Sequence, residues 1–235
     1  MAISRSLIEE LRDFDTALLA NTIGYIDPTP VHEYYMGGST RSVTPTLGPT
    51  TGVAVTCELD SSSPGGQPDT EGYLQQLEQM SRMVVPVVWV VKTVGSRPDH
   101  ECVLGDGMAK SLYSVGCVGA VTDGGVRDIP GLLTVPFAVY SRGVTIHHTA
   151  LRFRRMNEPI EIGGIVVRTG DVIHANAEGV IKIPPSCLDV LPAKAILMRA
   201  FEHEVHLALR RTDLSPAEKR AKTAAALAKY GFAGH

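Results

Sequence analysis

Residues 105–128 read GDGMAKSLYSVGCVGAVTDGGVRD. This segment predicts a glycine loop, a short helix, a buried strand and a second glycine loop that ends in Arg127-Asp128. The first loop opens a helix, so its free N–H groups suit an anion. The second loop follows an apolar strand, and loops on a rigid scaffold often carry catalytic residues. Twenty residues separate Asp106 from Arg127, and a helix of about three turns with a short strand could bring the two loops together.

Composition places the chain among ordinary globular proteins. It has 235 residues, of which 44% are hydrophobic and 20% charged, which is enough for one large domain with an appendage. We expect a single catalytic domain over residues 1–210 and a C-terminal helical extension over residues 211–235. The net charge of −3 and the pI of about 6.2 argue against a nucleic-acid partner.

Neither a membrane span nor a signal peptide is expected from the hydropathy pattern. The longest apolar run, residues 83–91, is too short to cross a bilayer and contains Pro86. Acidic and basic residues near the N-terminus stand where a signal peptide would have its apolar core. The cysteines are scattered and form no Cys-x-x-Cys pair, so we interpret them as reduced thiols that fill the core of a cytoplasmic protein. They are Cys57, Cys102, Cys117 and Cys187.

Helical periodicity is clearest at the two ends of the chain and before residue 84. Residues 95–104 are polar and irregular, so we expect them to form one wall of the site, and residues 129–131 predict a turn. The predicted helices are 6–22 with a break near Asp15, 70–83, 188–211, and a last one from Ser215-Pro216 to Gly231. The predicted strands are 52–59, 84–91, 135–140, a hairpin over 159–167, 172–175 and 179–183.

The order of these elements indicates the fold class. Strict alternation of strand and helix is absent, which argues against an eight-fold β/α barrel. Short strands and hairpins dominate the second half, while helices lie at the ends and before the central strand. We therefore predict an α/β fold, a layered β/β/α (α-β-β-α) sandwich with C-terminal helices.

Asp128 and Arg127 are the main candidates for chemistry, and each has a simpler alternative. Mg²⁺ often takes only one or two protein carboxylates and keeps several waters, so Asp128 alone can suffice at a strand end. The alternative is that Asp128 caps a helix before Ile129-Pro130. Arg127 could hold a carboxylate or keto oxygen through its planar fork, or it could form a surface ion pair.

The first loop and Lys92 are weaker candidates. Backbone N–H groups of Gly105-Asp106-Gly107-Met108 could hold an anion, although an ordinary strand-to-helix turn can have this sequence. The loop matches neither the phosphate-binding loop nor the dinucleotide fingerprint. Lys92 ends an apolar strand and could form a Schiff base with a keto acid, but a solvated strand terminus is the more ordinary interpretation.

Two pairs of histidines have spacings relevant to metal binding. His147 and His148 are adjacent, and adjacent residues of a strand face opposite ways, so we favour structural or surface roles. His203 and His206 have the i, i+3 spacing that can chelate on a helix. No third ligand is evident in the sequence, so a polar helix face is the simpler interpretation of that pair.

At residues 105–128 the sequence resembles the class II pyruvate aldolases typified by 4-hydroxy-4-methyl-2-oxoglutarate aldolase, also called 4-carboxy-4-hydroxy-2-oxoadipate aldolase. The wider superfamily includes the regulator of ribonuclease E activity. The resemblance implies a sandwich of that regulator's type and a homotrimer or homohexamer. It covers about residues 45–210 and rests on GDGMA at 105–109, the spacing to Arg127-Asp128, SRG at 141–143, and GDVIHA at 170–175 followed by Gly179-Val180.

The resemblance also implies roles for individual residues. Asp128 would bind Mg²⁺ or Mn²⁺ through a largely water-filled shell, and Arg127 would contact the pyruvyl oxygen. Backbone N–H groups of Gly107 and Met108 would hold the pyruvate carboxylate, and Asp106 would shape their loop. The implied activity is a divalent-metal-dependent aldolase that cleaves a 4-hydroxy-2-oxo acid to release pyruvate. Oxaloacetate decarboxylation needs the same enolate and is expected as a second activity.

Two segments depart from the family pattern. Family aldolases usually have a glutamate in the N-terminal region near the metal waters. In this chain the corresponding residues 22–25 read TIGY, and the nearest glutamate that could replace it is Glu33. The loop 93–104 also differs. These departures leave two alternatives, a non-catalytic binding protein like the ribonuclease regulator and another metal-dependent lyase or hydrolase on the same scaffold. The regulators typically lack the aspartate after the arginine, so Asp128 favours catalysis.

The long helix over residues 188–211 bears on assembly. Its apolar stripe is wider than one core contact needs, so we expect part of it to meet a neighbouring subunit. The polar residues in its middle form either a solvated face or a functional edge. By the resemblance, Glu202 matches an acidic residue that crosses the interface to the metal waters of the adjacent site. We therefore expect shared active sites with Glu202 acting in trans, and Glu33 is the alternative for proton transfer.

Overall fold

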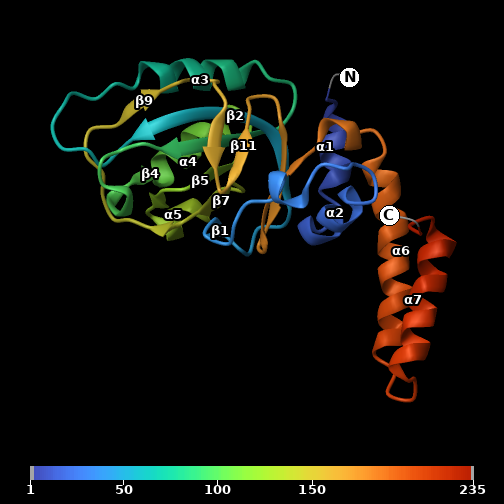
Figure 1. Cartoon of the computed structure of the whole chain (residues 1–235). Coiled ribbons are helices and arrows are strands. Elements are labelled where there is room, and N and C mark those ends of the chain that lie inside the picture. The colour runs from blue at the N-terminus through green and yellow to red at the C-terminus, as the bar shows by residue number, and fades with distance from the viewer. Residues whose placement is uncertain (1–2, 234–235) are drawn as a thin grey trace.

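A computed structural model describes residues 3–233 and shows a mixed sheet flanked by helices (Figure 1). The strand order is β1-β7-β5-β3-β2-β12-β13, and β9 also pairs with β2. The neighbouring strands β2, β3, β5 and β7 are parallel, whereas β1, β9, β12 and β13 pair antiparallel. The bounds are β1 Arg41–Ser42, β2 Thr50–Asp60, β3 Val87–Thr93, β5 Cys117–Thr122, β7 Ala138–Ser141, β9 Arg152–Arg154, β12 Val172–Asn176 and β13 Gly179–Ile183.

A second, three-stranded parallel sheet gives the fold its layers. It contains β4 (Cys102–Leu104), β6 (Gly125–Val126) and β8 (Gly143–Val144). β5 leads through a short turn into β6, and β7 leads likewise into β8. Helices α3 (Glu71–Ser81), α4 (Asp106–Ser114) and α5 (Ile129–Leu132) connect the parallel strands. This arrangement confirms the predicted α/β class of layered β/β/α sandwich.

The continuous apolar sequence of β3 reflects burial of both faces of the main sheet. Because successive side chains of a strand point to opposite faces, Val87, Trp89 and Val91 join the core that lies under α3 and α4. Val88 and Val90 join a second core on the opposite face. That face is covered by the predicted hairpin, which consists of β10 (Ile160–Ile162) and β11 (Ile165–Val167) joined at Gly163-Gly164.

A third core joins the N-terminal and C-terminal helices to the antiparallel end of the sheet. Helices α1 (Arg5–Leu11) and α2 (Thr16–Ile23) pack there with β12, β13 and α6 (Leu191–Leu209). Helix α7 (Pro216–Tyr230) runs back along α6, and this pair projects from the body (Figure 1). The capping box of Ser215 with Glu218 and the left-handed Gly231 set the predicted ends of α7. The division between residues 1–210 and 211–235 stays a prediction.

Two local expectations were wrong. Residues 95–104 are not irregular throughout, because Cys102–Leu104 form β4, which is fully buried and pairs with β6. Residues 129–131 belong to the one-turn helix α5 and not to a simple turn. Both elements depend on partners distant in sequence, which local polarity does not reveal. The lack of strand–helix alternation was also only apparent. Three crossovers join the parallel strands β2, β3, β5 and β7 through α3, α4 and α5, and two of them also contain a short strand, β4 or β6.

The cysteines and the helices agree with what composition indicated. All four cysteines are buried free thiols, and burial raises the pKa of Cys102 and of Cys187 to about 11. Such thiols are protonated at neutral pH and fill the core. Within residues 3–233 no helix is both long and apolar enough to cross a bilayer.

Candidate active site

The two glycine loops quoted at the outset meet in one pocket of about 390 Å³. The first loop follows β4 and the second follows β6, so parallel neighbours in the small sheet deliver both loops to the same edge. The Arg127 N–H donates to the Leu104 carbonyl oxygen at 3.0 Å and ties the second loop to the end of β4. The pocket is lined by residues 103–108, Arg127, Asp128, His148 and Leu151.

Asp128 occupies the N-cap position of α5 without capping it through its side chain. Its backbone is left-handed, with φ 58° and ψ 40°, and its carboxylate makes no capping hydrogen bond. The backbone oxygen instead accepts from the N–H groups of Gly131 at 2.8 Å and Leu132 at 3.0 Å. The side chain is 45% exposed. A left-handed conformation is uncommon for residues other than glycine, and here the carboxylate lies at the pocket uncapped, in an ion pair with Arg127.

Arg127 places a guanidinium beside that carboxylate. Its Nε lies 3.4 Å from Asp128 Oδ2, yet this nitrogen is buried and has no hydrogen-bond partner. Its Nη1 lies 3.4 Å from Nδ1 of His147. A buried donor without a hydrogen bond is costly, and here the ion pair with the Asp128 carboxylate offsets part of that cost.

The N-terminus of α4 supplies the other half of the pocket. Gly105 is the N-cap, and the first helical bond runs from the Ala109 N–H to the Gly105 carbonyl oxygen at 3.1 Å. The N–H groups of Gly107 and Met108 therefore have no backbone acceptor within the helix, although the Gly107 N–H interacts with the Asp106 carboxylate. A Cβ at Gly105 would lie 2.5 Å from Asp128 Oδ2, so the close approach of the two loops requires glycine at this position.

Asp106 is held at the start of α4 by the side chain one turn later. Lys110 Nζ lies 2.6 Å from Asp106 Oδ2. The hydrogen bond from Lys110 lowers the pKa of Asp106, and the nearby charge of Arg127 lowers it further. Asp106 therefore stays ionised at the mouth of the pocket, where it can shape the loop as expected from the sequence.

The histidine pair was placed too far from the chemistry by the sequence analysis. His148 lines the pocket half-buried, and its Nδ1 lies 2.7 Å from the Thr149 carbonyl oxygen. A carbonyl oxygen can only accept, so Nδ1 is the donor in this contact. The two imidazole rings are 5.3 Å apart. Residues 145–151 form a loop and not a strand, so alternation did not apply, and adjacency alone could not show that His148 lines the pocket.

Other candidate residues lie outside this pocket. Glu202 is on α6, where its Oε1 accepts a hydrogen bond from Asn21 at 3.1 Å, and α6 lies on the opposite side of the body (Figure 1). Glu33 is exposed in a short 3-10 helix, Val31–Glu33. Lys92 is ion-paired with Asp123. The role of Glu202 therefore stays a prediction about contact between subunits.

The donor set fits a hard divalent cation held mainly by water. Among residues 3–233 no three histidine, cysteine or carboxylate side chains are grouped so that they could hold a metal ion. Mg²⁺ and similar ions need only one or two carboxylates when several waters remain. The half-exposed carboxylate of Asp128, which is ion-paired with Arg127, would be the one protein ligand of such an ion in this pocket. His203 and His206 are exposed on α6.

Comparison with known proteins gives a consistent family. A model described as RraA-like, Aldolase/RraA, matches residues 28–182. A protein of Halalkalibacterium halodurans named "Putative 4-hydroxy-4-methyl-2-oxoglutarate aldolase" is 40% identical over 79 residues, which is 33% of this chain and only 36% of that protein.

Solved structures share the fold. The Streptomyces coelicolor protein RraAS2, described as an unusual member of the RNase ES inhibitor RraA family, has a TM-score of 0.70 at 22% identity, covering 88% of this chain and 99% of that one. A structure described as novel cellulases from gut-associated microbes has a TM-score of 0.72 at 17% identity, covering 86% and 87%. At such identities the likeness concerns the fold alone.

Proposed function

Because the chain belongs to the RraA-like (Aldolase/RraA) family, we propose that it is a divalent-metal-dependent lyase that cleaves a 4-hydroxy-2-oxo acid and releases pyruvate. The observation that carries the proposal is the Asp128 carboxylate. It stands at a helix N-cap position without capping, in an ion pair with Arg127 Nε at 3.4 Å and beside the N-terminus of α4. A purely structural aspartate at this position would be expected to hydrogen bond to the first turn of α5.

The first loop and Arg127 bind and orient the substrate in this proposal. The substrate carboxylate lies at the N-terminus of α4 and accepts from the N–H groups of Gly107 and Met108. Arg127 donates to the 2-keto oxygen, where negative charge develops as the carbon–carbon bond breaks. Mg²⁺ or Mn²⁺ held by Asp128 would supply Lewis-acid stabilisation of the same charge. Arg127 and an ion held by Asp128 would thus place two positive charges at one oxygen.

In this proposal the proton is transferred at the open side of the pocket, and the distal end of the substrate lies there too. Glu202 of a neighbouring subunit in a homotrimer or homohexamer is our candidate for moving the proton, and Glu33 is the alternative. Met108, Leu151 and His148 line the pocket beyond the charged groups. Apolar side chains there favour a substrate whose part beyond the reacting carbons is compact and partly apolar.

The test is a substrate panel with purified protein and Mg²⁺. Pyruvate release is followed from oxaloacetate, from 4-hydroxy-4-methyl-2-oxoglutarate and from a 4-hydroxy-2-oxo acid with an aliphatic tail, using lactate dehydrogenase as the coupling enzyme. We expect turnover of oxaloacetate and of at least one hydroxy-oxo acid. Arg127→Lys should lose on the order of 10²-fold or more in kcat/KM, because an ammonium cannot reproduce the planar fork.

A second candidate function has support from the fold. A structural relative is named as a member of an RNase inhibitor family, so a non-catalytic binding protein is the alternative. It predicts no pyruvate from any member of the panel and no requirement for a metal. Another lyase or hydrolase on this scaffold would instead show metal-dependent turnover of other substrates only.

A further inference from the structure

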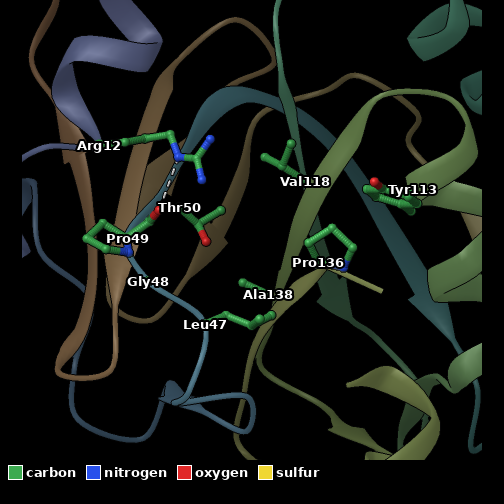
Figure 2. Close-up of a pocket in the computed structure, with 9 residues that line it drawn as sticks. All are labelled: Arg12, Leu47, Gly48, Pro49, Thr50, Tyr113, Val118, Pro136 and Ala138. Carbon is green, nitrogen blue, oxygen red and sulfur yellow. Dashed lines mark hydrogen bonds between the residues drawn. The ribbon is translucent and has the colours of Figure 1, made fainter. Parts of the chain in front are cut away.

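A second pocket, of about 330 Å³, lies away from the candidate active site. Its volume is near the lower end of the range of small-molecule sites, roughly 300–1,000 Å³. Its walls come from the end of α1, the segment entering β2, the last turn of α4, and the beginnings of β5 and β7 (Figure 2). We call it the Arg12 pocket after its one cationic side chain.

The Arg12 pocket and the candidate active site lie at opposite ends of the same elements. Asp106 is the first residue of α4 and lines the active site, whereas Tyr113 is in its last turn and lines the Arg12 pocket. Val118 and Ala138 lie at the amino ends of β5 and β7. Arg127, by contrast, lies beyond the carboxyl ends of β5 and β6. A molecule in the Arg12 pocket would therefore not compete with the substrate for space.

Arg12 is oriented but lacks an anionic partner. Its Nε donates to the Pro49 carbonyl oxygen at 3.3 Å, the bond drawn in Figure 2. Within residues 3–233 no carboxylate lies within ion-pair distance of its guanidinium. Figure 2 shows the guanidinium pointing toward the middle of the pocket, near Thr50. A planar guanidinium in this position suits a carboxylate.

The rest of the pocket is mainly apolar. Val118, Pro136, Ala138 and Leu47 face the space between Arg12 and the ring of Tyr113 (Figure 2). Apolar walls with a few polar groups that fix orientation are the usual composition of a ligand site. The charge is at one end and the aromatic ring is at the other, so the complementary molecule has an anionic head and a short apolar body.

We propose that the Arg12 pocket binds a small monocarboxylate with an apolar body. The carboxylate pairs with the terminal nitrogens of Arg12, and the body lies against Val118, Pro136 and Ala138 up to Tyr113. The site is separate from the pocket of Asp128, and its occupation does not depend on the lyase reaction or on a metal.

Isothermal titration of the full chain with hexanoate tests this directly. We expect saturable binding to the wild-type protein, no binding of hexylammonium, and no displacement of hexanoate by pyruvate. Arg12→Gln should weaken hexanoate binding by about tenfold or more, the loss typical of one charge-assisted contact. The matched control is Arg220→Gln, which changes an exposed arginine on α7 by the same charge and should bind as the wild type does.

A second variant guards against an indirect effect of Arg12 on the fold. Val118→Phe, at a half-buried position of the wall, narrows the apolar part and leaves Arg12 in place, so it should also lose hexanoate binding, with melting temperatures checked for every variant. Absence of saturable binding to the wild type would overturn the proposal. Equal binding by Arg12→Gln and wild type, or displacement by pyruvate, would also overturn it.

Discussion

Gly105→Ala tests whether the candidate site depends on the close approach of its two loops. A Cβ at this position would lie 2.5 Å from Asp128 Oδ2 and 3.1 Å from Arg127 Cγ. The Gly105 backbone is in the extended region, with φ −125° and ψ −168°, so alanine introduces no backbone strain. The Asp128 carboxylate would instead retreat by about 0.9 Å to reach an ordinary contact distance near 3.4 Å.

The displacement should affect the reaction much more than the stability. The Asp128 carboxylate is at the end of a half-exposed side chain, so its movement should change the free energy of unfolding by about 1 kcal/mol or less. A misplacement of about 1 Å at a reacting centre costs on the order of 10²-fold in rate. We expect kcat/KM for pyruvate release to fall about 100-fold while the melting temperature stays close to that of the wild type.

Gly38→Ala is the matched control for this substitution. Gly38 is exposed, and a Cβ there would meet no atom within 4 Å, so activity and melting temperature should both stay near the wild-type values. Wild-type turnover by Gly105→Ala, measured with the coupled pyruvate assay, would refute the idea that the carboxylate position matters. Equal losses in both variants would refute it as well.

Subunit exchange between inactive Asp128→Ala and inactive Glu202→Gln proteins should recover part of the lyase activity, because mixed oligomers combine the intact residue of each chain. Full activity of Glu202→Gln alone would remove that role. Burial lowers the pKa of His174 to about 4, so the unfolded chain binds the extra proton. The contribution of neutral His174 to the free energy of unfolding should be fully present above about pH 6.5 and should fall by roughly 3 kcal/mol toward pH 4. Urea titrations of His174→Asn should lack this decline. Lys92 is ion-paired with Asp123, so borohydride with pyruvate should add no mass to the protein, and an adduct would indicate Schiff-base chemistry.

The central segment was predictable because its signals are local. A glycine at an N-cap, a short amphipathic helix and an apolar strand follow each other within residues 105–122, and each is specified by its own sequence. The break between α1 and α2 and the capping box of α7 were visible for the same reason. The relation of the two loops was also accessible, since the helix and strand between them limit their separation.

The surroundings of the site depend on contacts between distant segments. Glu101 lies in a loop that reads as polar, yet it is buried and accepts hydrogen bonds from Ser61 N–H at 2.9 Å and Gly95 N–H at 2.5 Å. These partners lie forty and six residues away in the sequence. The position of His148 at the active site and the Arg12 pocket could not be predicted for the same reason. Each depends on loops or strand ends that meet only in the folded chain.

Binding of Mn²⁺ measured together with turnover tests the proposed lyase most directly. Protein stripped with EDTA is titrated with Mn²⁺ by electron paramagnetic resonance, and pyruvate release is recorded at each occupancy. We expect one site per chain, turnover that rises with its occupation, and loss of both in Asp128→Asn. Asp213→Asn, an exposed carboxylate beyond α6, should behave as the wild type. Unchanged Mn²⁺ binding by Asp128→Asn, or full turnover by the stripped protein, would contradict the assignment of Asp128 as the metal ligand of a pyruvate-releasing lyase.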